Sequence, residues 1–123
     1  MVHKSRILIV DDDAEICRQL RWMLADQFEI SVAGNMEEAA TKIDQEDPFS
    51  AAIIDLHLPP HLSTIEGGLS LIRSVRDTGA KTRIVVLSAD GSEEARTRSL
   101  EAGATRFLDK PADRNRILRA LEP

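Results

Sequence analysis

The stretch at residues 6–20, RILIVDDDAEICRQL, decides the fold. It begins with an apolar, largely β-branched run at 7–10 and changes abruptly to three adjacent aspartates, Asp11, Asp12 and Asp13. A short continuous apolar run predicts a strand covered on both faces of a parallel sheet. Carboxylates this close repel one another, so they indicate either the solvated start of a helix or the surroundings of a bound cation.

Four further apolar runs follow, and segments with helical spacing of apolar residues lie between and after them. The predicted strands after the first are FEISVA at 28–33, AAII at 51–54, IVVL at 84–87 and RFL at 106–108. The predicted helices lie within 16–24, 36–43, 69–75, 91–104 and 117–121. Five such alternating units, joined by right-handed crossovers, predict an α/β protein with a doubly wound parallel sheet and helices on both faces.

Residues typical of helix ends support these boundaries. Asp13, Asn35 and Ser92 are predicted N-caps, and Gly79 and Gly103 stand where helices should stop.

The fourth helical segment, GSEEARTRSLEAGA at 91–104, is nearly all polar. Ala95 and Leu100 are its clear core candidates, so we expect a loosely anchored helix.

Composition limits the classes of function. With 123 residues and a net charge of −5, the chain is expected to form one domain over 1–123 and to make no direct contact with nucleic acid. No apolar stretch is long enough for a membrane helix, and the first residues, MVHKSR, lack a secretory signal, so we expect a cytoplasmic protein without membrane contact. The lone Cys17 is interpreted as a buried structural thiol.

Chemically useful residues stand at the predicted carboxyl ends of the strands, where open α/β sheets place their sites. Asp11 and Asp12 follow the first strand, Asp55 the third, Ser88 the fourth and Lys110 the fifth. Clustered carboxylates suit Mg²⁺, and a lysine and a hydroxyl suit phosphoryl oxygens. This combination indicates transfer of a phosphoryl group to an aspartate.

These motifs resemble the receiver domain of bacterial two-component response regulators, the CheY-like family. The matching stretches are ILIVDDD, AIIDLHLPP, IVVLSAD and GATRFLDKP, which occur in the family's order over essentially the whole chain. The resemblance implies a flavodoxin-like fold with strand order 2-1-3-4-5. It also implies that Asp55 is the phosphoacceptor and that Asp11, Asp12, Asp55 and the backbone carbonyl of His57 hold Mg²⁺.

By the same resemblance, Ser88 and Lys110 bind the phosphoryl oxygens and the peptide bond before Pro111 is cis. Ser88 and Phe107 are the expected switch residues: Ser88 moves toward the phosphoryl group and the Phe107 ring turns into the space it leaves. From the residues alone, Phe107 is equally well a plain core aromatic. The moving surface would comprise the fourth helix, fifth strand and fifth helix.

The resemblance also implies partners. A sensor histidine kinase or phosphotransfer protein would supply the phosphoryl group, and an output domain or downstream protein would contact the moving surface. The family also forms homodimers through that surface. The domain assists its own phosphorylation and dephosphorylation but turns over no separate substrate, so it is not expected to be an enzyme. In the family, the residues at positions 57 and 90 influence the lifetime of the phosphoryl group.

One departure from the family pattern is the connection PPHLSTIEG at 59–67, which delays the glycine that opens the third helix by about five residues. The added residues could cover the phosphorylated aspartate, contact the kinase or bulge into solvent. Loops this close to a site are often functional.

Three other functions fit the residues less well than a receiver domain does. An aspartyl-phosphate phosphohydrolase would carry its nucleophile after the first strand, whereas the isolated Asp55 follows the third. A pseudo-receiver, which keeps the fold as an interaction module without phosphorylation, usually lacks one of the acids, the hydroxyl or the lysine, and all are present here. A nucleotide-binding domain would need a glycine-rich loop after the first strand, where this chain has aspartates.

Overall fold

The computed structural model describes residues 4–123, so the first three residues of the expected 1–123 domain lie outside the description. Strands and helices alternate throughout. Their bounds are β1 Ser5–Val10, α1 Ala14–Leu24, β2 Phe28–Ala33, α2 Met36–Gln45, β3 Ala51–Ile54, α3 Glu66–Asp77, β4 Arg83–Ser88, α4 Glu93–Ala102, β5 Arg106–Asp109 and α5 Arg114–Leu121.

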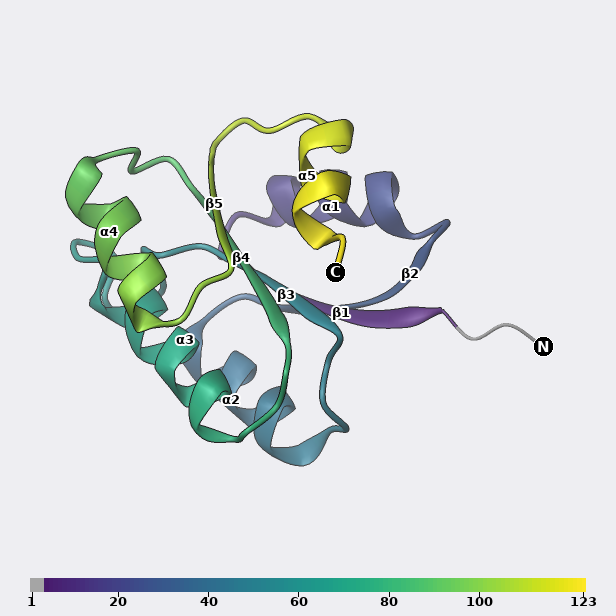
Figure 1. Cartoon of the computed structure of the whole chain (residues 1–123), viewed down its shortest axis with the longest axis horizontal. Helices are drawn as coiled ribbons and strands as arrows, with labels where there is room; N and C mark the ends of the chain where they lie inside the picture. Colours follow the sequence, from purple (N-terminus) through teal and green to yellow (C-terminus); the bar gives the residue numbers. More distant parts are fainter. Residues whose placement is uncertain (1–3) are drawn as a thin grey trace.

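The five strands form one parallel sheet in the order β2-β1-β3-β4-β5. Helices α1 and α5 lie on one face of the sheet, and α2, α3 and α4 lie on the other (Figure 1). The predicted α/β class, the five parallel strands and the flavodoxin-like strand order are therefore confirmed. Since all strands are parallel, their carboxyl ends meet along one edge of the sheet.

The alternation of side chains along β1 divides the core into two layers. Leu8 and Val10 pack in the layer that contains residues of α2, α3 and α4. Ile7 and Ile9 pack in the layer that contains residues of α1 and α5. All four side chains have no exposed surface, which explains why a strand covered on both faces reads as one continuous apolar run.

The predicted helix ends are confirmed. The Asp13, Asn35 and Ser92 side chains accept hydrogen bonds from the first turns of α1, α2 and α4. Gly79 and Gly103 have φ angles of 81° and 122°, in the region that side chains other than glycine rarely adopt. These conformations end α3 and α4 close to the predicted positions.

One prediction for α4 is wrong. Leu100 is 42% exposed, and the buried residues of α4 are Ala95 and Ser99. Ala95 and Ser99 share one side of the helix because they are four residues apart. The Ser99 hydroxyl donates a 2.7 Å hydrogen bond to the Ala95 carbonyl, which satisfies it away from water. The buried residues of α4 are thus two small side chains, and the partly buried Ala102 also packs against the core.

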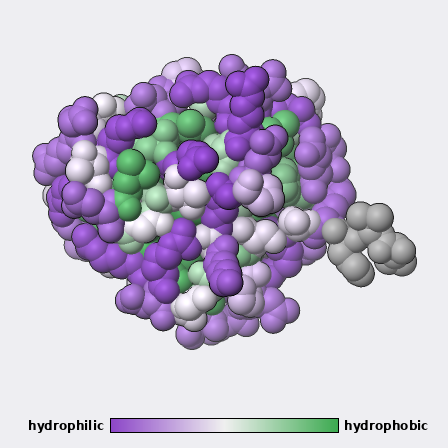
Figure 2. Space-filling view, in the orientation of Figure 1, coloured by the Kyte–Doolittle hydropathy of each residue, from purple (hydrophilic) through white to green (hydrophobic). Residues whose placement is uncertain are grey.

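The surface is mainly polar. Figure 2 shows hydrophilic residues around the rim of one face and hydrophobic residues in patches nearer its centre. Among large apolar side chains, Trp22 is 86% exposed and Leu62 is 54% exposed. Within residues 4–123, no helix has the length and apolar character needed to cross a membrane.

Candidate functional site

The carboxyl edge of the sheet brings together acidic and basic side chains from three strand ends. Lys110 Nζ lies 2.8 Å from Asp11 Oδ2 and 3.3 Å from Asp55 Oδ2. The parallel pairing places them there, because Asp11 follows β1, Asp55 follows β3 and Lys110 follows β5. Asp11 and Asp55 are 4% and 7% exposed, so Lys110 neutralises carboxylates that have little access to water.

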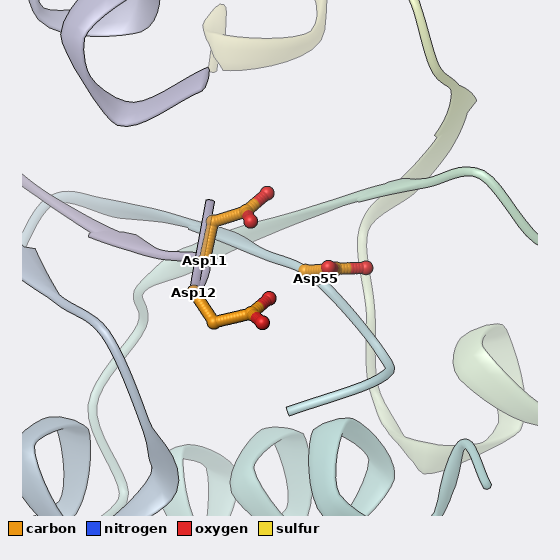
Figure 3. Close-up of side chains that lie close together, drawn as sticks. All are labelled: Asp11, Asp12 and Asp55. Atoms are coloured by element: carbon orange, nitrogen blue, oxygen red, sulfur yellow. The ribbon is translucent and has the colours of Figure 1, made fainter. Parts of the chain in front are cut away.

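Asp12 completes an acidic cluster with Asp11 and Asp55. One carboxylate oxygen from each residue lies within 4.8 Å of the others, and Figure 3 shows the three side chains beside one another at the strand ends. Asp12 is exposed, so the cluster is open to solvent on one side. A site with oxygen donors and an open side fits a hard divalent cation that keeps several of its waters.

The charge count also fits a divalent cation. Three carboxylates and one lysine leave a local charge of −2 when all four groups are ionised. Burial raises the pKa of Asp55, although Lys110 opposes this effect. Burial would lower the pKa of Lys110, but hydrogen bonds and charge from Asp11 and Asp55 outweigh it and raise that pKa. Lys110 therefore stays protonated, and the charge of Asp55 stays costly.

Backbone groups hold the two buried aspartates in place. The Leu56 amide donates to Asp55 Oδ1 at 2.8 Å, and the Asp13 amide donates to Asp11 Oδ1 at 2.9 Å. Oδ2 of both Asp11 and Asp55 contacts Lys110. Each carboxylate is thus oriented by a neighbouring amide and by the lysine.

Ser88 lies at the same edge but points into its own loop. Its side chain is fully buried, and its Oγ accepts a 3.1 Å hydrogen bond from the Asp90 amide. Its carbonyl accepts from the Lys110 amide at 2.9 Å, which ties the end of β4 to the end of β5. Ser88 and Lys110 are therefore joined through their backbones, and the Ser88 hydroxyl makes no hydrogen bond to Asp55.

His57 joins two loops at the rim of the site. Its Nε2 lies 3.3 Å from Asp90 Oδ2, and its Nδ1 lies 2.9 Å from the Leu62 carbonyl. Hydrogen bonds from Ser92, followed by that from His57, lower the pKa of Asp90. The lengthened connection at 59–67 is thereby attached to the β4–α4 loop through a side chain two residues after Asp55.

Phe107 is 8% exposed and packs in the core layer on the side of α4. The Arg96 guanidinium lies 6.0 Å from the centre of its ring, within range of a cation–π contact.

The Lys110–Pro111 peptide bond is cis, and so is Pro59–Pro60.

Cys17 and Asp13 have structural surroundings. Cys17 is 8% exposed, its Sγ donates to the Asp11 carbonyl at 3.3 Å, and burial raises the pKa of its thiol. A buried thiol with a raised pKa is a poor nucleophile, as predicted. Asp13 Oδ1 accepts from the Glu15 amide at 2.9 Å, which makes this aspartate the cap of α1.

Two features of the site were not predicted from the sequence. The His57–Asp90 contact joins residues 33 positions apart, and no local pattern indicates it. The position of Gly68 is the second: a Cβ there would lie 2.5 Å from Leu56 Cα and 2.8 Å from the Asp55 carbonyl oxygen. The signal for this close approach was the Gly67-Gly68 pair itself, since glycine is favoured where two backbone segments touch.

Comparison with known proteins agrees with this geometry. The family model for the response regulator receiver domain matches residues 7–122. The acid tolerance regulatory protein ActR of Rhizobium meliloti is 35% identical over 116 residues, which cover 94% of this chain and 57% of ActR. The chain belongs to the response regulator receiver domain family of two-component systems.

Solved structures show the same architecture. A response regulator protein from Burkholderia pseudomallei, solved with a phosphorylated aspartic acid, a calcium ion and citrate, superposes with a TM-score of 0.86 at 30% identity, covering 97% of this chain and 67% of that one. The CheX-CheY-BeF3-Mg²⁺ complex from Borrelia burgdorferi gives 0.84 at 27% identity, covering 95% and 86%. The chain spans about half the length of the curated relatives it matches.

Proposed function

We propose that this receiver domain accepts a phosphoryl group on Asp55 from a phosphohistidine of a sensor histidine kinase or a phosphotransfer protein. The observation that carries the proposal is the contact of one lysine with two buried aspartates beside a third aspartate. A carboxylate that is buried, has a raised pKa and faces a fixed cation is a typical nucleophile in such a site.

The acidic cluster fits Mg²⁺ as the resident cation. Asp11, Asp12 and Asp55 would hold it, together with the backbone carbonyl of His57. When bound, Mg²⁺ supplies charge neutralisation to the phosphoryl oxygens. The calcium ion in the Burkholderia structure and the Mg²⁺ in the Borrelia complex belong to proteins of the same fold.

The residues of this chain divide the work of the transfer. We assign Oδ2 of Asp55 as the attacking atom because it faces Lys110, whereas Oδ1 accepts from the Leu56 amide. A phosphorus–oxygen bond forms as the phosphorus–nitrogen bond to the donor imidazole breaks, and the imidazole leaves with the bonding electrons and takes up a proton. Lys110 Nζ, 3.3 Å from Oδ2, is placed to donate to a phosphoryl oxygen.

Ser88 would couple phosphorylation of Asp55 to a conformational change in the rest of the domain. Its hydroxyl would leave the Asp90 amide and donate to a phosphoryl oxygen, and Phe107 would repack into the space that it leaves. The surface formed by α4, β5 and α5 would then change its contacts with an output domain, a downstream protein or a second copy of the chain. The domain turns over no separate substrate, and water later removes the phosphoryl group from Asp55.

Intact-mass measurement after incubation with acetyl phosphate tests this proposal. We expect one phosphoryl adduct on the wild-type chain with Mg²⁺, and none without Mg²⁺ or in Asp55→Asn. Absence of an adduct with Mg²⁺ and rapid sampling would refute phosphorylation and favour an interaction module of the pseudo-receiver kind.

A further inference from the structure

Helix α4 is held by charged contacts on two opposite sides. Arg98 NH2 lies 2.6 Å from Glu66 Oε1, the first residue of α3. The Arg96 guanidinium lies 6.0 Å from the centre of the Phe107 ring on β5. Residues two positions apart in a helix point about 200° apart around its axis, so one arginine faces α3 and the other faces β5.

These contacts matter because the apolar anchoring of α4 is small. The buried side chains of α4 are Ala95 and Ser99, Ala102 is partly buried against the core, and Leu100 is 42% exposed. Little apolar area therefore opposes a lateral displacement of the helix. A shift toward β5 would lengthen the contact with Glu66, and a shift toward α3 would lengthen the contact with Phe107.

Glu66 is fixed relative to the phosphoacceptor. The Gly68 amide donates to the Leu56 carbonyl at 3.0 Å, and the backbone of Gly68 touches the backbone of Asp55 and Leu56. The start of α3 is thereby packed directly against the segment that carries Asp55. Glu66, at the start of α3, therefore connects this segment to α4 through its ion pair with Arg98.

The arrangement that contains the Glu66–Arg98 pair is also the one in which Ser88 is turned away from Asp55. The Ser88 hydroxyl accepts from the Asp90 amide at 3.1 Å, and Ser92, the cap of α4, donates its amide to Asp90 Oδ1 at 3.2 Å. The Ser88 loop and the start of α4 are therefore connected. A contact that holds α4 against α3 also favours this position of the Ser88 loop.

We propose that Arg98 is a positioning residue that, through its ion pair with Glu66, holds α4 in the arrangement that disfavours the phosphoryl-bound state. This inference rests on the proposed function of Asp55. Removing the pair shifts the domain toward the arrangement in which Ser88 reaches the phosphoryl group. The pair is partly exposed, so its loss is expected to change the equilibrium about two- to fivefold.

Glu94 provides a matched control. It lies 3.6 Å from Arg98 but belongs to α4 itself, so its contact does not join α4 to α3. In Glu66→Gln, Arg98 keeps Glu94 and loses the partner on α3. In Glu94→Gln, Arg98 keeps the partner on α3.

The test is titration of the wild-type chain and the variants with beryllofluoride in the presence of Mg²⁺, combined with hydrogen exchange of the amides of residues 93–102. We expect Glu66→Gln to bind beryllofluoride about two- to fivefold more tightly than wild type, with faster exchange in α4. Glu94→Gln should bind as wild type does or more weakly, and the double variant E66Q/R98Q should bind no more tightly than E66Q.

Unchanged or weaker binding by Glu66→Gln would overturn the proposal, as would an equal gain in Glu94→Gln. A wild-type chain that neither binds beryllofluoride nor forms an adduct with acetyl phosphate would overturn the function of Asp55 and this inference with it. Wild-type binding without an effect of Glu66→Gln would overturn the inference alone.

Discussion

Gly68 is the position where a single methyl group should disturb both the fold and the site. In Gly68→Ala, the new Cβ would lie 2.5 Å from Leu56 Cα, 2.8 Å from the Asp55 carbonyl oxygen and 2.9 Å from the Leu56 carbonyl oxygen. All three neighbours are backbone atoms on the segment that carries the phosphoacceptor, so none can move aside as a flexible side chain would. Overpacking of this kind costs about 3 kcal/mol at its upper range.

The better helix propensity of alanine raises the free energy of unfolding by at most about 1 kcal/mol and offsets part of this loss. The net expectation for Gly68→Ala is therefore a loss of about 2 kcal/mol, or a fall in Tm of about 8 °C for a domain of this size. Gly67→Ala is the matched control on the neighbouring residue. Its Cβ would meet the flexible end of Met36 at 2.9 Å and backbone no closer than 3.5 Å.

Urea unfolding followed by circular dichroism measures the free energy of unfolding of both variants, and titration with Mg²⁺ and beryllofluoride measures the state of the site. We expect Gly67→Ala to lie within about 1 kcal/mol of wild type and to keep its affinity for beryllofluoride. Gly68→Ala should lose stability and affinity together. Equal stability of the two variants would refute the argument that the backbone of α3 fixes the segment after Asp55.

Three further predictions follow from the charges and the core. Burial raises the pKa of Asp55, so folding favours the protonated carboxyl, and the contribution of Asp55 to stability falls as pH rises through that pKa. Asp55→Asn should therefore be at least as stable as wild type at pH 7, and the difference should shrink as the pH is lowered. A lower Tm for Asp55→Asn at pH 7 would contradict this. Lys110→Ala should lower the free energy of unfolding in urea by about 1–3 kcal/mol, because Asp11 and Asp55 lose their neighbouring cation. Mg²⁺ should raise the Tm of this variant more than that of wild type. An equal effect of Mg²⁺ on both proteins would count against a site in which Lys110 and Mg²⁺ neutralise the same carboxylates. Leu100→Ser should change the free energy of unfolding by less than about 0.5 kcal/mol, whereas Ser99→Leu should lower it by about 1–3 kcal/mol. A larger loss for Leu100→Ser than for Ser99→Leu would indicate that Leu100, and not Ser99, lies in the core.

The order and approximate bounds of the strands and helices could be predicted because they depend on residues close together in the sequence. A continuous apolar run such as 7–10 specifies a strand covered on both faces, and the cap residues Asp13, Asn35 and Ser92 mark where helices begin. Parallel strands then bring Asp11, Asp55 and Lys110 to one edge without further information.

The remainder depends on contacts that the sequence pattern does not carry. Leu100 was expected in the core because it is apolar, but Ser99 shares the inner side of α4 with Ala95 and satisfies its hydroxyl within the helix. The Glu66–Arg98 pair depends on the crossing of α3 and α4, which no spacing in the chain encodes. The lengthened connection gave no indication that His57 would bind Asp90 across the rim of the site.

The most direct test of the central claim is to locate the phosphorylated residue. An aspartyl phosphate is reduced by borohydride to homoserine, and peptide sequencing by mass spectrometry then identifies the position that reacted. After incubation with acetyl phosphate and Mg²⁺, homoserine at position 55 alone is the predicted result. Homoserine at position 11 or 12, or at no position while Asp55→Asn still gains a phosphoryl group, would contradict the account.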